Sequence, residues 1–383
     1  MRWLFWPAAA LIAYVHVGYL GWLWLRGKLR PRAVNRASFE PPVSLLMVVR
    51  NEEAVLAEKL RNLLDLDYPA HKRQIIVVSD GSTDETESIL REQARNPQVN
   101  VLLNQLARGK AQGLNDGMNL AQGEIVVFTD ARQRIEPDAL RLLMENFADQ
   151  KVGAVSGELM LGDAKNGETG RGMGLYWQIE KRVRELESSS GSVVGATGAL
   201  YAARRSLLTE LPADTILDDV LIPMNVARQG FRVLFDGRAR AWDAADLGAA
   251  REFQRKVRTL TGNYQLLRLA PWLLGKENPL RFEFVCHKLL RLAVPFALVA
   301  TLISSWFIPG AIFRFAFWAQ AGFYGLSLLG WTGWSLGPVT RPSEVAYTFA
   351  TLNLAALVAF ANFVAGRKQV WIRSPLPKEV HLR

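Results

Sequence analysis

The stretch "QIIVVSDGSTDET" (residues 74–86) has the pattern of a buried strand that ends in polar residues. Its apolar run is typical of a strand covered on both faces. An acid, Asp80, closes the run, and Gly81 permits a sharp turn. Ser82 and Glu85 follow with the spacing of a helix capping box. The stretch therefore predicts a strand, a turn and a helix, which is the repeating unit of an α/β fold.

The same unit recurs on both sides of this stretch. "VSLLMVV" (43–49) is a second buried-strand run, and "EEAVLAEKLRNLLDL" (52–66) after it has helical spacing of apolar residues. Two more strands are predicted over 100–105 and 124–130, with a helix from Gly109 between them. This alternation predicts a Rossmann-like, mostly parallel sheet that binds ligands at the carboxyl ends of its strands.

The bulk composition narrows the class of protein. The chain has 383 residues, half of them hydrophobic, and a net charge of +10, which favours anionic partners such as nucleotide phosphates or a lipid surface. Basic residues gather beside apolar segments and not on an aromatic platform, so we expect no nucleic-acid partner. Cys286 is the only cysteine, which excludes an internal disulfide. Four scattered histidines make a histidine metal cluster improbable: His16, His71, His287 and His381.

The N-terminal segment "WLFWPAAALIAYVHVGYLGWLWL" (3–25) is long enough to cross a bilayer, which needs roughly 20 apolar residues. A cleaved signal peptide is the alternative, but its apolar region runs about 7–15 residues. Here the segment ends in tryptophans and a basic cluster, which favours a retained anchor. By the positive-inside rule this cluster predicts a cytoplasmic domain after the anchor. Its members are Arg26, Lys28, Arg30 and Arg32.

The chain turns apolar again after residue 285. Three segments, 289–310, 311–331 and 345–366, are predicted membrane segments, which makes the chain a multi-pass protein of the inner (plasma) membrane. Three full crossings would place the basic tail from residue 366 outside the cell, against the charge rule. Either one segment is re-entrant or interfacial, or the tail breaks the rule. We expect a cytoplasmic tail.

Polar residues close each predicted strand. Asn51 and Glu52 can offer acceptors to a ligand over the sheet, although acids also favour an ordinary helix start. Asp80 could hold a base edge while Lys110, at a helix N-terminus, meets phosphates. Asp130 lies where an α/β enzyme would hold a metal or a phosphate, but the position two residues on is an arginine and not a second acid.

Further along the chain, Asp218 and Asp219 begin a predicted helix. Two adjacent acids at a helix N-terminus are commonly no more than complements to the helix dipole. On the residues alone, that interpretation and a functional one are equally supported.

Four motifs in this order, "RNEE", "SDGSTDET", "GKAQGLNDG" and "GEIVVFTDA", resemble the family 2 glycosyltransferases. The resemblance extends over residues 43–275, and it implies a GT-A nucleotide-sugar-binding fold. The membrane layout further resembles the membrane-integrated members that build cell-envelope polysaccharides and glycolipids. The resemblance implies inverting transfer of a sugar from a nucleotide-diphospho-sugar, most often a UDP-sugar.

The resemblance also implies roles for particular residues. Asp130 would bind Mg²⁺ or Mn²⁺ together with the donor diphosphate. Because Mg²⁺ usually takes only one or two protein carboxylates, Arg132 in place of a second acid does not exclude this site; we assign Arg132 no role. Asp219 would be the general base, beside Asp218, since inverting transfer needs one carboxylate to accept the acceptor's proton. The loop 195–208 would lie on the acceptor side. Nucleotide contacts would fall on Asn51, Glu53, Asp80 and Lys110.

Residues 251–269 have the spacing of an amphipathic helix, with arginines opposite the apolar face, and such a helix can lie on anionic lipid. Processive family members carry a Gln-x-x-Arg-Trp motif here. This chain has Arg255, Arg258 and Thr259 in its place. The missing tryptophan favours the addition of one or a few sugars, and Arg255 and Arg258 remain candidate donor contacts.

The sequence thus predicts four parts: an anchor with its basic flank (1–36), a GT-A domain (37–248), an amphipathic interface region (249–284) and C-terminal membrane segments with a basic tail (285–383). The predicted function is sugar transfer to a membrane-held lipid-linked or glycan acceptor. Three alternatives stay open: a processive polysaccharide synthase, a polyprenyl-phosphate sugar synthase and a non-catalytic membrane scaffold. A transporter is disfavoured because the apolar segments carry few ionisable groups.

Overall fold

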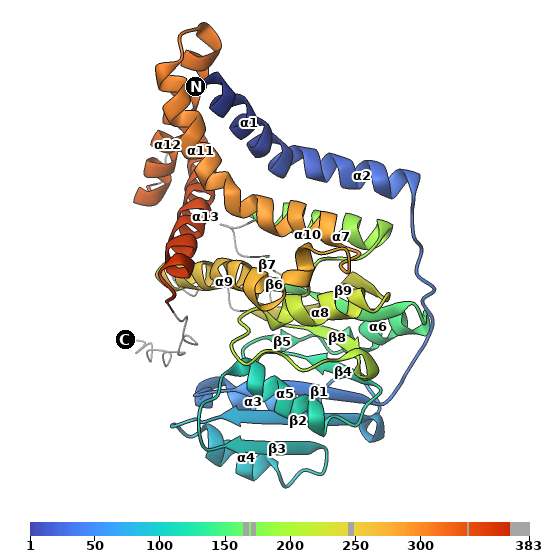
Figure 1. The fold of residues 1–383 in the computed structure, drawn as a ribbon. Coiled ribbons are helices and arrows are strands. Elements are labelled where there is room, and N and C mark those ends of the chain that lie inside the picture. Colours follow the sequence, from blue (N-terminus) through green and yellow to red (C-terminus); the bar gives the residue numbers. More distant parts are fainter. Residues whose placement is uncertain (164–167, 170–173, 244–248, 335–336, 368–383) are drawn as a thin grey trace.

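The computed structural model describes residues 1–163, 168–169, 174–243, 249–334 and 337–367. A sheet flanked by helices forms one end of the molecule, and long apolar helices form the other (Figure 1). The chain starts among the apolar helices, runs through the sheet domain and returns to them.

The sheet has nine strands, eight of them in the order β3-β2-β1-β4-β8-β6-β9-β5, with β7 paired to β6. Pairing is parallel from β3 through β4, as predicted, while β8 runs antiparallel to both of its neighbours. The strands are β1 (Val43–Val49), β2 (Arg73–Asp80), β3 (Val99–Asn104), β4 (Ile125–Phe128), β5 (Arg134–Ile135), β6 (Val152–Asp163), β7 (Glu168–Thr169), β8 (Tyr201–Arg204) and β9 (Arg232–Asp243).

Helices cover both faces of the parallel half of the sheet. Every residue of β1 is buried, and its side chains alternate between two hydrophobic clusters. Leu46 and Val48 face the cluster under α5 (Lys110–Leu120), where added Cβ atoms on Gly117 and Gly113 would lie 2.2 and 2.7 Å from them. The missing side chains let α5 pack directly on the sheet, which fixes the helix start near the strand ends. The opposite face is covered by α3 (Glu53–Leu64) and α6 (Ala139–Glu145).

Two local predictions are wrong. Strand β4 ends at Phe128, so Asp130 lies in the loop that follows the strand. Helix α4 (Thr86–Gln93) starts four residues after Ser82, so the predicted capping box does not form. The Ser82 hydroxyl instead accepts a hydrogen bond from the Asn51 N–H at 3.2 Å. The cause is a contact between the loops after β1 and β2, which holds residues 82–85 outside the helix.

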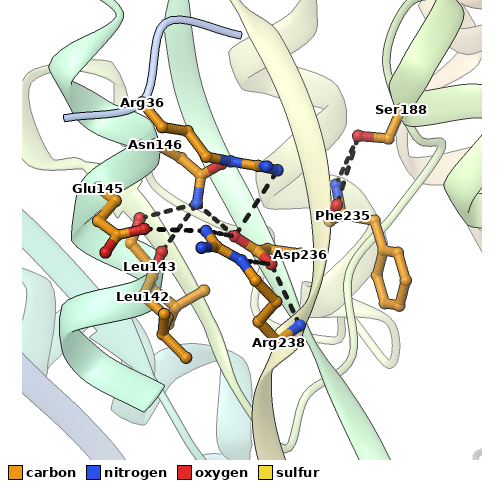
Figure 2. Close-up of polar contacts among 9 residues, drawn as sticks. All are labelled: Arg36, Leu142, Leu143, Glu145, Asn146, Ser188, Phe235, Asp236 and Arg238. Carbon is orange, nitrogen blue, oxygen red and sulfur yellow. Dashed lines mark hydrogen bonds and ion pairs between the residues drawn. The ribbon is translucent and has the colours of Figure 1, made fainter. Parts of the chain in front are cut away.

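A buried carboxylate ties the linker between anchor and sheet to the domain (Figure 2). Asp236, in β9, accepts hydrogen bonds from Asn146 at 2.8 Å and from Arg238, and Arg36 of the linker lies 3.8 Å away. Burial alone would raise the pKa of Asp236, but the hydrogen bonds and the arginines outweigh it and lower the pKa. Nearby, the Ser188 hydroxyl accepts from the Phe235 N–H. These contacts join the linker, the short helical turn after α6 (Asn146–Ala148), β9 and α7 (Gly174–Ser190).

Three helical stretches are long and apolar enough to cross a membrane: Arg2–Leu29, Arg281–Phe307 and Gly337–Val364. The first contains α1 (Arg2–Ala13), a π-helical turn (Tyr14–Gly18) and α2 (Tyr19–Leu29). The second contains α10 (Arg281–Phe284), another π-helical turn (Val285–Leu289) and α11 (Leu290–Phe307), and the third contains α13 (Thr340–Val364).

The C-terminal region therefore has two candidate spans and not three. The segment predicted over 311–331 does form a helix, α12 (Ala311–Thr332), but it is not among the candidate spans of the described chain. Arg314 and Gln320 lower its mean hydropathy. The side of the membrane on which the tail lies stays a prediction, because residues 368–383 lie outside the described residues.

Helix α9 (Ala249–Leu269) carries the predicted apolar face, but this face packs against protein. Val257 lies in a cluster with Ala355 and Ala359 of α13, and Tyr264 stacks on Phe363. The interpretation that this face rests on lipid is therefore wrong. Helix α9 connects the sheet domain to α13.

Candidate active site

Two of the predicted nucleotide contacts hold the strand-end loops together. Asn51 has a left-handed φ of 55°, and its side-chain oxygen accepts the Thr83 N–H at 2.7 Å. Glu53 accepts the Glu85 N–H at 2.8 Å. Both residues thus join the loop after β1 to the loop after β2. Direct contact with a nucleotide stays a prediction for both.

Asp80 fixes the entry to α5. Its side chain is fully buried, and its two carboxylate oxygens accept the backbone N–H groups of Arg108 and Gly109 at 2.7 and 2.9 Å. Gly109 has a φ of 96°, which only glycine adopts readily. This turn places Lys110 at the first position of α5. The observed contact is thus with the backbone, and a nucleobase contact at Asp80 stays a prediction.

Lys110 joins two of the predicted functional acids. Its Nζ lies 2.9 Å from Oδ1 of Asp130 and 3.3 Å from Oδ1 of Asp218. Burial alone would lower the pKa of Lys110, but Asp130, Asp218 and then Asp219 outweigh it and raise the pKa. The lysine is therefore a fixed cation between the loop after β4 and the start of α8 (Asp218–Arg228). Its predicted contact with donor phosphates is not tested by this arrangement.

Asp219 lies in the first turn of α8 and is held from two sides. Its backbone carbonyl accepts the Ala196 N–H at 2.7 Å, and its Oδ2 accepts the Gly198 N–H at 3.2 Å. Burial, followed by the neighbouring Asp218, raises the pKa of Asp219 from 3.8 to about 6. A carboxylate with a pKa in this range is a proton acceptor at neutral pH, and it is a better one than an ordinary aspartate.

Gly198 lies between the carboxylates of Asp130 and Asp219. A Cβ placed on this glycine would lie 3.2 Å from Oδ2 of Asp130 and 3.7 Å from Oδ2 of Asp219. The two carboxylates therefore face the same small space, and the absence of a side chain at Gly198 keeps this space open. The predicted metal ligand and the predicted base, 89 positions apart in the sequence, are neighbours in the structure.

We expect Gly198→Ala to lower sugar transfer at least about tenfold while the protein stays folded. The added methyl group would occupy the space between the two carboxylates, but its three nearest atoms all belong to the side chains of Asp130 and Asp219. Initial rates and thermal melting of the purified variant measure the two effects. The control is Gly21→Ala, whose added Cβ has no atom within 4 Å. An unchanged rate would show that this space is not used.

The loop that carries Asp130 rests on a buried lysine that the sequence analysis missed. Lys59 donates to the Thr129 hydroxyl at 2.8 Å and to the Gln133 carbonyl at 2.6 Å. Burial lowers the pKa of Lys59 to about 7, although Asp130 opposes this shift. Lys59 lies on the buried face of α3, with leucines at helical spacing on both sides. A lysine among leucines at helical spacing was therefore a sequence signal for a buried lysine.

Two further residues border the same loop. Arg132 pairs with Glu52 at 3.7 Å, so the residue that replaces a second acid has a carboxylate partner of its own. Tyr201 is buried and stacks on Phe128, with ring centroids 4.6 Å apart. Burial and then the acids Asp218, Asp219 and Asp130 raise its pKa well above the usual range. Tyr201 stands in a short apolar strand, so nothing in the sequence marked it as a residue of the site.

Of the two candidate arginines on α9, Arg255 is connected to the site. Arg255 lies 3.7 Å from Asp243, which also accepts a hydrogen bond at 2.9 Å from Gln133 of the Asp130 loop. Arg258 has no ion pair with any residue that the structure describes. Donor contact by either arginine stays a prediction.

A metal ion would find few protein ligands here. Within the described ranges, no group of three or more His, Cys, Asp or Glu side chains could hold one. Asp130 still fits the predicted role, because its Oδ1 faces Lys110 while its Oδ2 faces the space that Gly198 leaves open. A divalent ion at Oδ2 would need oxygens from water and from the donor's phosphates to complete its shell.

Comparison with known proteins identifies the domain that holds most of these residues. The profile of the family described as "Glycosyl transferase family 2" matches residues 44–211. Residues 44–211 form a glycosyltransferase family 2 domain. The match includes Asp80, Lys110, Asp130 and Gly198. Asp219 lies eight residues after the end of the matched range. Its hydrogen bonds with Ala196 and Gly198 place it beside the matched domain.

Characterised relatives of the chain include two kinds of synthase. The poly-beta-1,6-N-acetyl-D-glucosamine synthase of Staphylococcus epidermidis is 26% identical over 243 residues, 62% of this chain and 58% of the relative. The beta-monoglucosyldiacylglycerol synthase of a Nostoc species is 31% identical over 186 residues, 47% of this chain and 40% of the relative. The chain thus spans less than two thirds of the length of these relatives.

A solved structure extends the likeness beyond the family 2 domain. The mannosyltransferase of Pyrobaculum calidifontis, determined with GDP-Man and Mn²⁺, superposes with a TM-score of 0.72 at 24% identity. The superposition covers 95% of this chain and 99% of the other. The predicted fold class, a GT-A domain with flanking apolar helices, is confirmed.

Proposed function

We propose that this protein is an inverting glycosyltransferase that moves a sugar from a nucleotide-diphospho-sugar to a membrane-held acceptor. One observation carries the proposal: Asp219, with its raised pKa, and Asp130 face one small space at the edge of a family 2 domain. The two carboxylates then have separate tasks, one for the acceptor's proton and one for the donor's diphosphate.

In the proposed reaction, the acceptor hydroxyl attacks the anomeric carbon of the donor sugar from the side of Asp219. The new bond joins the acceptor oxygen to this carbon, and the bond between the carbon and the donor's phosphate breaks. Asp219 takes the hydroxyl proton, while the Gly198 N–H holds its Oδ2 in place. Lys110 lies where it can offset negative charge on the leaving diphosphate.

A divalent cation fits the site as a cofactor. Mg²⁺ or Mn²⁺ held by Asp130 would neutralise charge on the departing diphosphate, so this group would need no protonation. The Pyrobaculum mannosyltransferase was solved with Mn²⁺, which makes Mn²⁺ the first ion to test.

The donor and the acceptor are proposed by class. A UDP-sugar is our first candidate donor, and GDP-mannose is second because the superposed mannosyltransferase was solved with it. The named relatives make a polysaccharide and a glycolipid, so a lipid-linked or glycan acceptor in envelope synthesis is proposed. The three apolar helical stretches would hold the protein in the inner membrane as a multi-pass protein, with the sheet domain in the cytoplasm.

A processive polysaccharide synthase is the second candidate, because the Staphylococcus relative is named as one. Thr259 argues for short products, since it lies exposed on α9 at the position of the motif's tryptophan. Product length decides between the two candidates, because a processive synthase makes long chains and the proposed enzyme adds one or a few sugars. The non-catalytic scaffold is disfavoured by the Lys110–Asp130–Asp218 cluster, because the mostly buried pair of Lys110 and Asp218 stabilises a fold poorly on its own.

The test is a donor screen on the purified protein in lipid nanodiscs. Nucleotide release is measured for a panel of UDP- and GDP-sugars, with a membrane lipid extract as acceptor source and with or without Mn²⁺. We expect release with one donor, dependent on the metal and stimulated by the extract. No release with any donor would reject the proposed function.

The rate of transfer should fall about tenfold for each pH unit below about 6. Asp219 must be ionised to accept the proton, and its raised pKa sets the pH at which the base form is lost. The charged and titratable groups that shift this pKa are Asp218 and Asp130, which raise it, and Lys110 and Lys288, which lower it. A profile of kcat/KM between pH 4.5 and 8 measures the effect. A flat profile would exclude Asp219 as the base.

A further inference from the structure

Lys59 is a buried lysine on an otherwise apolar helix face. Only 3% of its surface is exposed, and it shares one face of α3 with three leucines that pack against the sheet, Leu56, Leu60 and Leu63. Burial lowers the pKa of Lys59 to about 7, although the charge of Asp130 opposes the shift. The fold thus stabilises the charged form of this lysine less than water does. Packing alone therefore does not account for a lysine at this position.

The Lys59 side chain bonds both ends of the loop that carries Asp130. Its Nζ donates to the Thr129 hydroxyl at 2.8 Å and to the Gln133 carbonyl at 2.6 Å. The same hydroxyl has a longer contact of 3.3 Å with the Asp130 carbonyl. Thr129 and Gln133 are both buried, so water does not compete for the two bonds. Lys59 therefore fixes the spacing between the two ends of this loop.

The Thr129 hydroxyl extends this constraint to the base side of the site. Its hydrogen points to the nearer carbonyl, that of Ala199 at 2.8 Å, and its oxygen accepts from Lys59. Ala199 follows Gly198, whose N–H holds Oδ2 of Asp219 at 3.2 Å. A short chain of hydrogen bonds thus runs from Lys59 through Thr129 to the loop that holds the proposed base.

The relative position of the two carboxylates depends on these two loops. Oδ2 of Asp130 and Oδ2 of Asp219 lie 3.2 and 3.7 Å from where a Cβ on Gly198 would stand, so the space between them is small. Transfer needs the donor's diphosphate, on the side of Asp130, and the acceptor hydroxyl, on the side of Asp219, to be aligned. A misplacement of about 1 Å can lower a rate about 10²-fold.

We propose that Lys59 is a positioning residue that sets the distance between Asp130 and Asp219. This inference rests on the proposed function. Lys59 takes part in no bond-making step, and it acts by holding the loop of Asp130, through Thr129 and Gln133, against the loop that holds Asp219. The rate of transfer then depends on Lys59. Joint binding of the metal and the nucleoside diphosphate does not, because it needs Asp130 and not its distance from the base.

The test compares Lys59→Met, Thr129→Val and the double variant with wild type in lipid nanodiscs. Methionine completes the apolar face of α3, and valine keeps the shape of threonine without its hydroxyl. Lys72→Met is the matched control: Lys72 also donates to a carbonyl, that of Glu40 at 2.9 Å, but it precedes β2 and so lies at the opposite end of the sheet from Asp130. The readouts are kcat and KM for labelled donor with lipid extract, calorimetric binding of Mn²⁺ with UDP or GDP, and thermal melting.

We expect Lys59→Met to lower kcat about 10- to 100-fold, with little change in the KM for the donor or in joint binding. Thr129→Val should lower kcat by a smaller factor, because the bond to the Gln133 carbonyl remains. The double variant should lose no more than Lys59→Met alone, since both substitutions break one chain of hydrogen bonds. Lys72→Met should keep the wild-type kcat.

An unchanged kcat in Lys59→Met, or an equal loss in Lys72→Met, would overturn the inference. Losses that multiply in the double variant would also overturn it, because the two residues would then act independently. Loss of joint binding in Lys59→Met would make this lysine a support of the metal site alone.

If melting shows that Lys59→Met does not fold, Thr129→Val decides. A lower kcat with joint binding kept supports the inference, and an unchanged kcat rejects it. Transfer by wild type with any of these results leaves the proposed function standing. Absence of transfer in wild type would reject the function itself.

Discussion

Asp219→Asn should lower the rate of sugar transfer about 10²- to 10⁴-fold, which is the usual contribution of a positioned general base. Asparagine keeps the size of the side chain, and its oxygen can still accept the Gly198 N–H, so the geometry of the site is retained. What is lost is the group that takes the acceptor's proton. Donor binding, which involves the other side of the site, should change little.

The same variant should not be less stable than wild type at pH 7.5. The folded-state pKa of Asp219, about 6, lies above its ordinary 3.8, so the fold favours the protonated acid. The stability this preference gives is complete below pH 3.8 and is lost as the pH rises through 6. Ionised Asp219 therefore destabilises the fold at neutral pH, by no more than about 3 kcal/mol. A neutral amide removes this cost.

Initial rates, donor affinity and thermal melting of Asp219→Asn measure the three effects, with exposed Asp214→Asn as a control five residues away. Loss of transfer with a melting temperature that does not fall identifies a catalytic group. Full activity in Asp219→Asn would instead favour a polyprenyl-phosphate sugar synthase, whose acceptor phosphate needs little help from a base.

Asp130→Asn should reduce transfer at least about 100-fold and remove most of its dependence on Mn²⁺. A bound cation contributes several kcal/mol by neutralising charge on the leaving group, and Oδ2 of Asp130 faces the open space beside Gly198. The substitution also removes the charge that Lys110 meets at 2.9 Å. Both effects act on the donor side of the site.

Titration calorimetry separates these effects. Because few protein oxygens surround Asp130, Mn²⁺ alone should bind wild type weakly, and Mn²⁺ with the nucleoside diphosphate should bind tightly. The variant should lose the joint binding. Asp138→Asn, at an exposed acid just before α6, is the control. Tight binding of Mn²⁺ to nucleotide-free wild type, or metal-dependent activity in Asp130→Asn, would contradict the assignment.

The parallel half of the sheet was predictable because its strands are covered on both faces. A run such as "VSLLMVV" has every residue buried, which leaves little choice but a central strand. The helix starts at Lys110 and Asp218 were predictable from glycine and acid signals. Strands β6, β7 and β9 were not assigned, because the pairing of β6 with β9 joins segments far apart in the chain.

The site was only partly predictable for the same reason. Its acids stand near strand and helix ends, where sequence patterns are informative, so Asp130 and Asp219 were among the predicted site residues. Lys59 and Tyr201 act from buried positions where a core residue is the ordinary expectation. The apolar face of α9 was recognised but given the wrong partner, since amphipathic spacing predicts a buried face and does not say whether lipid or α13 covers it.

The central claim is that Asp130 and Asp219 serve one transfer reaction. It is tested most directly by incubating nanodisc-embedded protein with labelled donor, Mn²⁺ and lipid extract, and by measuring labelled lipid and released nucleotide together. The account predicts equal amounts of both in wild type, and loss of labelled lipid in Asp219→Asn and Asp130→Asn, with donor binding kept only in the first. Labelled lipid formed at the wild-type rate by both variants would contradict it.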